Sequence, residues 1–188
     1  MLPMPRILTG AFVLALLAAC PWVLGAAVPH GWHLGGSNPA DYLSGVDAAA
    51  MYQGHPSGYL KTSKTAANGY GLLMQEFPAA AYAGKRVRLS AFVKTDRVRD
   101  WAGLWMQYAE GPEPGVAVAK RQEPLINGAT EWTSYEVVTD VPAGATTIEI
   151  GVMLHGPGTV WINSVSFAVT GPNEAKSPTP PANFDFEQ

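Results

Sequence analysis

The sequence predicts an all-β domain in which two antiparallel sheets pack face to face as a β-sandwich. Apolar residues make up 47% of the 188 residues, enough to bury a core. Charged residues make up only 14%, and 20 glycines and 16 prolines indicate many turns. Short apolar or alternating segments recur between these turns at fairly regular spacing, which is typical of sandwiches.

The first half of the predicted domain holds five strands divided by turn residues. The clearest alternates over ten residues, with Val87, Leu89, Ala91 and Val93 on one face and Arg88, Ser90, Phe92 and Lys94 on the other. Turns are expected at 37–39, 55–58 and 67–69, and a brief helical turn at 79–82. The five strands are predicted at 32–35, 42–46, 59–63, 70–77 and 86–95.

The second half continues the pattern with turns at 111–115, 140–144 and 155–158. Strands are predicted at 102–109, 132–139, 146–154 and 159–169, which gives roughly nine or ten in all. So many strands usually protect their edges by pairing into two stacked sheets.

The first 27 residues have the pattern of an export signal. The apolar run 7–19 follows a single positive charge and is too short to span a bilayer comfortably. Two cleavage sites are compatible with it: a lipobox ending at Ala19, which would place a lipid on Cys20, and the small residues 25–27. An uncleaved anchor is a third possibility. We expect a periplasmic or secreted protein that contacts the membrane only through this segment or a lipid on Cys20.

The mature chain is expected to be one sandwich domain, 28–170, followed by a tail, 171–188. Cys20 is the single cysteine, so the domain has no disulfide and no thiol chemistry. The tail begins with a polar, proline-rich linker, 171–182. Phe184 and Phe186 then return at a spacing of two, and we expect them to dock on this domain or on a partner.

Several segments resemble the galactose-binding-like jelly rolls, a sandwich fold used by many carbohydrate-binding modules of bacterial exported proteins. The resemblance covers about residues 31–169 and rests on segments 84–91, 101–106, 132–138 and 160–167, with 36–42 similar to one bacterial subgroup. It implies a jelly-roll fold and does not specify a ligand. Relatives often carry two acidic residues that help to hold a structural calcium where this chain has Asn163 and Ser164. We therefore expect no metal and no cofactor.

Charge and motif content exclude several functions. The net charge of −3 provides no basic field for nucleic acid and no polybasic stripe for anionic membranes. No nucleophile elbow, His-Glu-x-x-His sequence, phosphate-binding loop or dinucleotide motif occurs. His55 and His155 are interpreted as exposed turn residues. The chain is therefore not expected to be an enzyme, and a small hydrolase with an unfamiliar site remains an alternative.

The leading prediction is a non-catalytic, exported module that binds carbohydrate. Sugar sites combine an aromatic face for stacking with planar polar side chains for hydroxyl groups. Trp105 is the predicted platform and must be exposed for this role; a tryptophan buried in the core is the competing interpretation. The sheet-face residues expected to share the site are Gln107, Arg88, Ser90, Glu149 and Gln75.

Two further predictions remain open at this stage. A second, loop-based ligand site is expected around Tyr52, His55 and Tyr59. The alternative function is a periplasmic protein–protein interaction domain, in which the Phe184/Phe186 tail or a sheet edge docks on an envelope protein by strand addition.

Overall fold

The structure is a computed structural model that describes residues 27–111, 116–171 and 183–186, and strands account for most of them. Two 3-10 turns interrupt the strands, Pro39–Asp41 and Ala79–Ala81, the second where a helical turn was expected. The strands are β1 (His33–Gly36), β2 (Tyr42–Tyr52), β3 (His55–Thr62), β4 (Tyr70–Pro78), β5 (Arg86–Glu110), β6 (Val116–Arg121), β7 (Ile126–Asp140), β8 (Ala145–His155) and β9 (Thr159–Val169).

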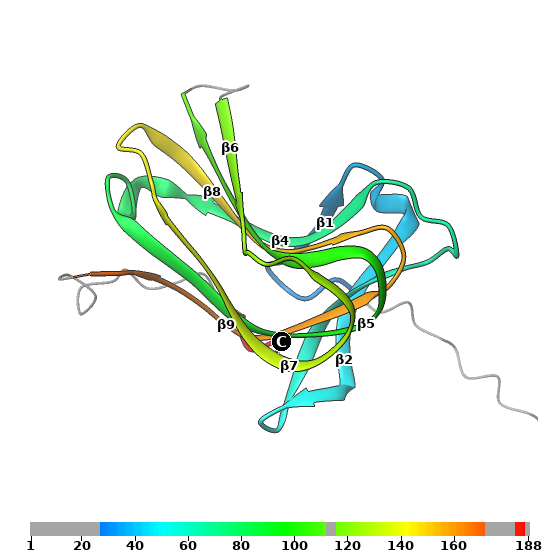
Figure 1. Ribbon diagram of the computed structural model, residues 1–188. Helices are drawn as coiled ribbons and strands as arrows, with labels where there is room; N and C mark the ends of the chain where they lie inside the picture. Colours follow the sequence, from blue (N-terminus) through cyan, green and yellow to red (C-terminus); the bar gives the residue numbers. More distant parts are fainter. Residues whose placement is uncertain (1–26, 112–115, 172–182, 187–188) are drawn as a thin grey trace, which may run out of the picture.

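These strands form one antiparallel sheet that curls into two layers. The order along the sheet is β1-β4-β8-β5-β9-β3-β2, and β6 and β7 also pair with β5. Viewed as in Figure 1, β4, β6 and β8 lie in the upper layer, and β2, β7 and β9 lie in the lower one. The predicted fold class, an antiparallel β-sandwich, is confirmed.

A single strand of 25 residues, β5, belongs to both layers. The sequence predicted two strands here, 86–95 and 102–109, and that division is wrong. The first half of β5 pairs with β9 and β7, and the second half pairs with β8 and β6. Register shifts between Val93 and Ala102, together with Arg97 at a φ of 51°, mark the bend that carries the chain across (Figure 1).

The main core lies between the two layers. The alternation predicted for 86–95 is present, because Val87, Leu89 and Val93 are fully buried while Arg88 is exposed. Burying a side chain of this size contributes about 1.5–3 kcal/mol. The opposite layer supplies a matching row of core residues, Ile148, Ile150, Val152 and Leu154 of β8, each with 0% exposure.

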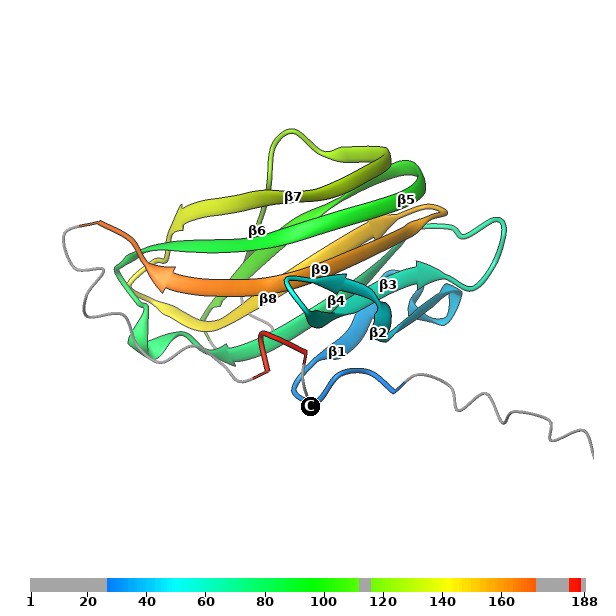
Figure 2. The same ribbon diagram turned by 90° about the horizontal axis from the view of Figure 1, so that it is seen from below.

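The C-terminal segment 183–186 docks on the domain to which it belongs. Phe186 is 1% exposed, and its ring centroid lies 4.9 Å from that of Trp32. The Trp32 indole donates a hydrogen bond to the Asn183 carbonyl at 3.0 Å. Gly58 permits this packing, because a Cβ there would lie 2.4 Å from Cε1 of Phe186. The expected docking of the two phenylalanines is confirmed, and it occurs within the chain, beside β1 (Figure 2).

The predicted export signal, Cys20 and the proline-rich linker lie outside the described residues, so these remain predictions. Within the described ranges, no helix is long and apolar enough to cross a membrane.

Candidate functional site

The sandwich presents two outer faces of different character. We call the outward side of β1, β4, β8, β6 and the second half of β5 the cavity face; it carries Tyr70, Leu72, Met74, Glu76, Trp101, Trp105, Gln107, Arg121, Glu149, Met153 and His155. We call the outward side of β2, β3, β9, β7 and the first half of β5 the charged face; it carries Asp47, Tyr59, Lys61, Arg88, Ser90, Phe92, Lys94, Asp96, Trp132 and Trp161.

The bend in β5 divides the sheet-face site that the sequence predicted. Arg88 and Ser90 lie on the charged face, opposite Ala168 and Ser166 of β9. Trp105 and Gln107 lie on the cavity face, where Gln107 is opposite Glu149. The two groups point away from each other on opposite layers, so the prediction that they share one face is wrong.

Two further members of that set are buried. Trp105 is 4% exposed, and it packs with Leu72 and Met153 in a small apolar cluster. The expectation that Trp105 offers an exposed stacking face is therefore wrong. Gln75 is 3% exposed, and its register partner Ile150 places it on the core side of β4. Its neighbour Glu76 faces outward instead, opposite Glu149.

The cavity face is hollowed beside Trp105. The hollow has a volume of about 520 Å³. In register, Gly103 lies opposite Met153, and Gly151 lies opposite Trp105. The Gln122 side chain packs against Gly103, and Gly151 lets β4 approach closely, because a Cβ there would lie 2.0 Å from the Leu73 carbonyl oxygen. The hollow is lined by Tyr70, Trp101, Trp105, Gln107, Ala119, Arg121, Met153 and His155.

Trp101 forms a wall of this cavity, and its indole ring lies between the side chains of His155 and Arg121. The His155 ring stacks on it at 5.4 Å between centroids and 16° between planes. The Arg121 guanidinium carbon lies 5.0 Å from the centroid of Trp101. Because β8 and β6 pair with opposite edges of β5, His155 and Arg121 approach the indole from opposite sides. Asp100 holds His155 in place through Nδ1 at 3.0 Å.

Sequence reasoning missed most of the residues that line this cavity. His155 was interpreted as an exposed turn residue, but it ends β8 and is half-buried. Arg121 was missed because β6 was not predicted, although Val116 and Val118 have the spacing of a strand. Tyr70 began one predicted strand and Trp101 directly preceded another, with no signal that the two side chains face a common hollow.

The structure does not bring together all three residues of the secondary site predicted around the β2–β3 loop. Tyr52 and His55 are register partners at the tip of the hairpin. Tyr52 stacks on Phe92 with 4.2 Å between ring centroids. Tyr59 lies four residues further along β3, opposite Trp161 of β9. The hairpin tip and Tyr59 therefore form two separate places on the charged face.

A partly buried hydrogen bond orients Trp161 on the charged face. Its indole donates to Oδ2 of Asp47 at 2.9 Å, and the backbone of Ala49 donates to Oδ1 at 2.9 Å. Burial alone would raise the pKa of the Asp47 carboxyl, but these donors and the charge of Lys61 together hold it below its ordinary value.

Asn163, which stands where the resemblance implied an acidic residue, has a structural role. Its amide donates to the Pro56 carbonyl at 2.8 Å and to the Ser57 hydroxyl at 2.9 Å, which ties β9 to β3. Within the described ranges, no group of three or more His, Cys, Asp and Glu side chains is arranged to hold a metal ion.

Comparison with known proteins gives one relative by sequence. No protein-family model matches the chain. The chain is 40% identical over 138 residues to YbfP, an uncharacterized HTH-type transcriptional regulator of Bacillus subtilis strain 168. The match covers 73% of this chain and 47% of that protein, so the chain spans about half the length of this relative.

Solved structures of carbohydrate-binding modules superpose on the sandwich. The CBM22-1 and GH10 modules of Clostridium thermocellum xylanase 10B, complexed with xylohexaose, give a TM-score of 0.58 at 16% identity over 75% of this chain and 26% of theirs. The CBM22-1 xylan-binding domain of Paenibacillus barcinonensis Xyn10C gives 0.56 at 13% identity over 77% of this chain and 89% of its own. Identities this low establish the fold alone: this chain has the jelly-roll sandwich fold of carbohydrate-binding modules.

Proposed function

We propose that this chain is an exported, non-catalytic carbohydrate-binding module whose ligand lies in the cavity face. The observation that carries the proposal is the hollow of about 520 Å³ with Trp101 in its wall. It combines aromatic surface with planar polar side chains, the combination that sugar recognition requires. The export signal predicted for residues 1–27 supports a role outside the cytoplasm.

Trp101 is the residue best placed to stack on a sugar ring. Unlike Trp105 it is half-exposed, and the group on its outer side, Arg121, is itself exposed. A cation–π contact at an exposed site is worth only about 0.5–1 kcal/mol. Displacing Arg121 from the indole is therefore inexpensive, and the freed guanidinium can donate to hydroxyl groups. Gln107, on the same wall, offers a second planar hydrogen-bonding group.

The alternative functions have less support. A protein-docking module would present a large apolar patch. In the described residues, Val28, Leu43 and Met51 are the exposed large hydrophobic residues, and the C-terminal phenylalanines pack on their own domain. A hydrolase acting through paired carboxylates would need two of them in the cavity, whose lining includes no Asp or Glu.

The regulator relative is compatible with ligand recognition. The chain corresponds to about half of that protein, and its net charge of −3 lacks the overall basic excess that DNA binding favours. Binding of a small ligand or glycan is a property that a domain of this fold can supply in both proteins.

The decisive experiment is a binding screen against neutral polysaccharides and oligosaccharides, followed by calorimetry with the wild-type chain and Trp101→Ala. We expect at least about tenfold weaker binding in the variant, equivalent to about 1.4 kcal/mol. Trp132→Ala is the matched control, because Trp132 is a half-exposed tryptophan of the charged face. Its affinity should stay within about twofold of wild type. An unchanged affinity in Trp101→Ala, or an equal loss in both variants, would contradict the proposal.

A further inference from the structure

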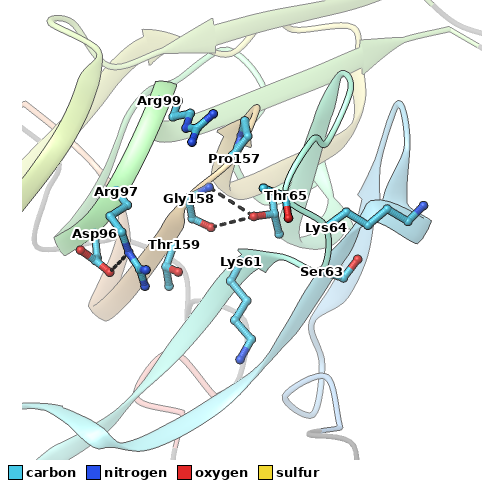
Figure 3. Close-up of a pocket in the computed structure, with 11 residues that line it drawn as sticks. Lys61, Ser63, Lys64, Thr65, Asp96, Arg97, Arg99, Pro157, Gly158 and Thr159 are labelled. Carbon is cyan, nitrogen blue, oxygen red and sulfur yellow. Dashed lines mark hydrogen bonds and ion pairs between the residues drawn. The ribbon is translucent and has the colours of Figure 1, made fainter.

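A groove rich in positive charge lies at one end of the sandwich, away from the cavity face. Three segments build it: the end of β3 with the loop that follows, the bend of β5, and the β8–β9 turn (Figure 3). Its volume is about 440 Å³. Four cations line it, Lys61, Lys64, Arg97 and Arg99, against the single carboxylate of Asp96. The lining therefore has a net charge of +3 (four minus one) in a chain whose net charge is −3.

Part of this charge is not neutralised by the protein. Arg97 pairs with Asp96 at 2.8 Å, and Lys64 pairs with Asp41. Arg99, by contrast, has no ion-pair partner among the described carboxylates. Figure 3 shows Arg97 and Arg99 on the β5 side of the groove, across Gly158 and Thr159 from Lys64.

The walls of the groove are fixed by backbone contacts. The Arg99 amide donates to the Pro157 carbonyl at 2.9 Å, and the Thr62 amide donates to the Gly158 carbonyl at 3.0 Å. Gly158 allows the β8–β9 turn to approach β5, because a Cβ there would lie 2.7 Å from Cα of Val98. The groove is thus preorganised, which reduces the entropy lost when a ligand binds.

Aromatic surface continues the groove onto the charged face. An adjoining hollow of about 570 Å³ shares Lys61, Asp96, Arg97 and Thr159 with the cationic end. It adds Tyr59 and Trp161, both half-exposed. Trp161 is oriented by Asp47, and the Lys61 ammonium lies 5.0 Å from the Tyr59 ring centroid.

We propose that this continuous groove is a second binding site, selective for an acidic saccharide. The oxyanion is bound by Arg97 and Arg99, and the adjoining sugar ring lies against Trp161, with Lys61 beside it. A planar guanidinium pairs with either a carboxylate or a phosphate in a two-pronged geometry, so the shared chemistry is an oxyanion carried on a sugar. The site lies at one end of the sandwich and continues onto the charged face, and it does not depend on ligand binding in the cavity.

The test is calorimetric titration of the wild-type chain and Arg97→Gln/Arg99→Gln with two probes, a galacturonate oligosaccharide and mannose 6-phosphate. We expect wild type to bind at least one probe, and the double variant to bind it at least tenfold more weakly. Raising the salt from about 0.05 to 0.5 M should weaken wild-type binding, because the charges are screened. The probe that binds distinguishes the carboxylate from the phosphate.

Two control variants show whether binding of the acidic probe requires the groove itself. One tests the effect of lost positive charge elsewhere, and the other tests the cavity. Arg86→Gln/Arg88→Gln removes the same charge from exposed positions about ten residues away along β5, and should bind the acidic probe as wild type does. Trp101→Ala should also leave acidic-probe binding unchanged while weakening neutral glycans. The proposal is overturned if neither probe binds, if Arg97→Gln/Arg99→Gln binds normally, or if both double variants lose affinity equally.

Discussion

The two outer faces of this sandwich both carry tryptophans, but in different surroundings. On the cavity face, Trp105 is buried with Leu72 and Met153 in an apolar cluster, and a hollow lies above them. On the charged face, Trp132 and Trp161 are half-exposed and stand among lysines and carboxylates. The difference shows that aromatic content alone does not identify a binding face. What matters is which neighbouring side chains cover the aromatic ring and which carry charge.

Each face also creates its hollow in a different way. The cavity forms on a layer, between outward-facing side chains of β4, β5, β6 and β8. The cationic groove forms at the end of the strands, where turns and the bend of β5 gather charged residues. Neutral and acidic ligands are therefore expected at different places. Three changes to the chain test how much the residues of each face contribute to stability.

The largest effect on stability is expected from Gly151→Ala under the cavity. The new Cβ would meet backbone atoms of Leu73, which cannot move without disturbing the β4–β8 pairing. We expect the free energy of unfolding to fall by about 2–3 kcal/mol, measured by urea denaturation. Gly144→Ala is the control, because its nearest neighbour would be 3.9 Å away. A loss below about 0.5 kcal/mol in Gly151→Ala would show that β4 can shift.

A smaller, pH-dependent effect is expected from Asp47→Asn on the charged face. The pKa of Asp47 is lowered from 3.8 in the folded chain, because its hydrogen bonds and Lys61 together outweigh the effect of burial. The charged carboxylate therefore stabilises the fold above pH 3.8, and this stabilisation is lost as the pH falls through the lower, folded pKa. After allowance for solvent screening, we expect wild type to exceed the variant by about 1 kcal/mol at neutral pH.

Urea denaturation at a series of pH values down to about 2 checks this prediction, and the difference between the two proteins should shrink in acid. A difference that grows in acid would contradict the assigned direction.

The smallest effect is expected from Lys94→Met, which breaks an ion pair of the charged face. Lys94 and Glu131 lie 3.0 Å apart, but the Glu131 side chain is 87% exposed. An exposed pair contributes at most about 0.5–1 kcal/mol, and salt reduces it. Thermal unfolding at low and high salt should show a small difference that disappears in salt. A decrease of several kcal/mol in the free energy of unfolding would contradict this prediction and show that the ion pair is a major source of stability.

The fold was largely predictable because its signals are local. The alternation in 86–95 indicated a strand buried on one side. The turn residues marked where strands end, and the small number of charged residues favoured a turn-rich β protein. The two phenylalanines of the tail were predicted to dock for the same reason. The strand β6 was missed because its alternation is short and follows a turn rich in proline and glycine.

The candidate site was much less predictable. Periodicity says which residues of one strand share a side, but not which layer that part of the strand belongs to. Arg88 and Gln107 lie on the same strand, yet the bend between them places them on opposite outer faces. Trp105 was misjudged because an outward-facing position can still be covered by its neighbours on the sheet.

The sequence by itself determined that this chain folds as an antiparallel β-sandwich, because turn residues and a two-residue period act over short distances. The tertiary structure decided where the hollows and the cationic groove lie. Those depend on register across strands, on the bend in β5 and on residues as distant as Trp101 and His155 meeting. Such contacts are set by how the whole sheet curls, a property that no single segment encodes.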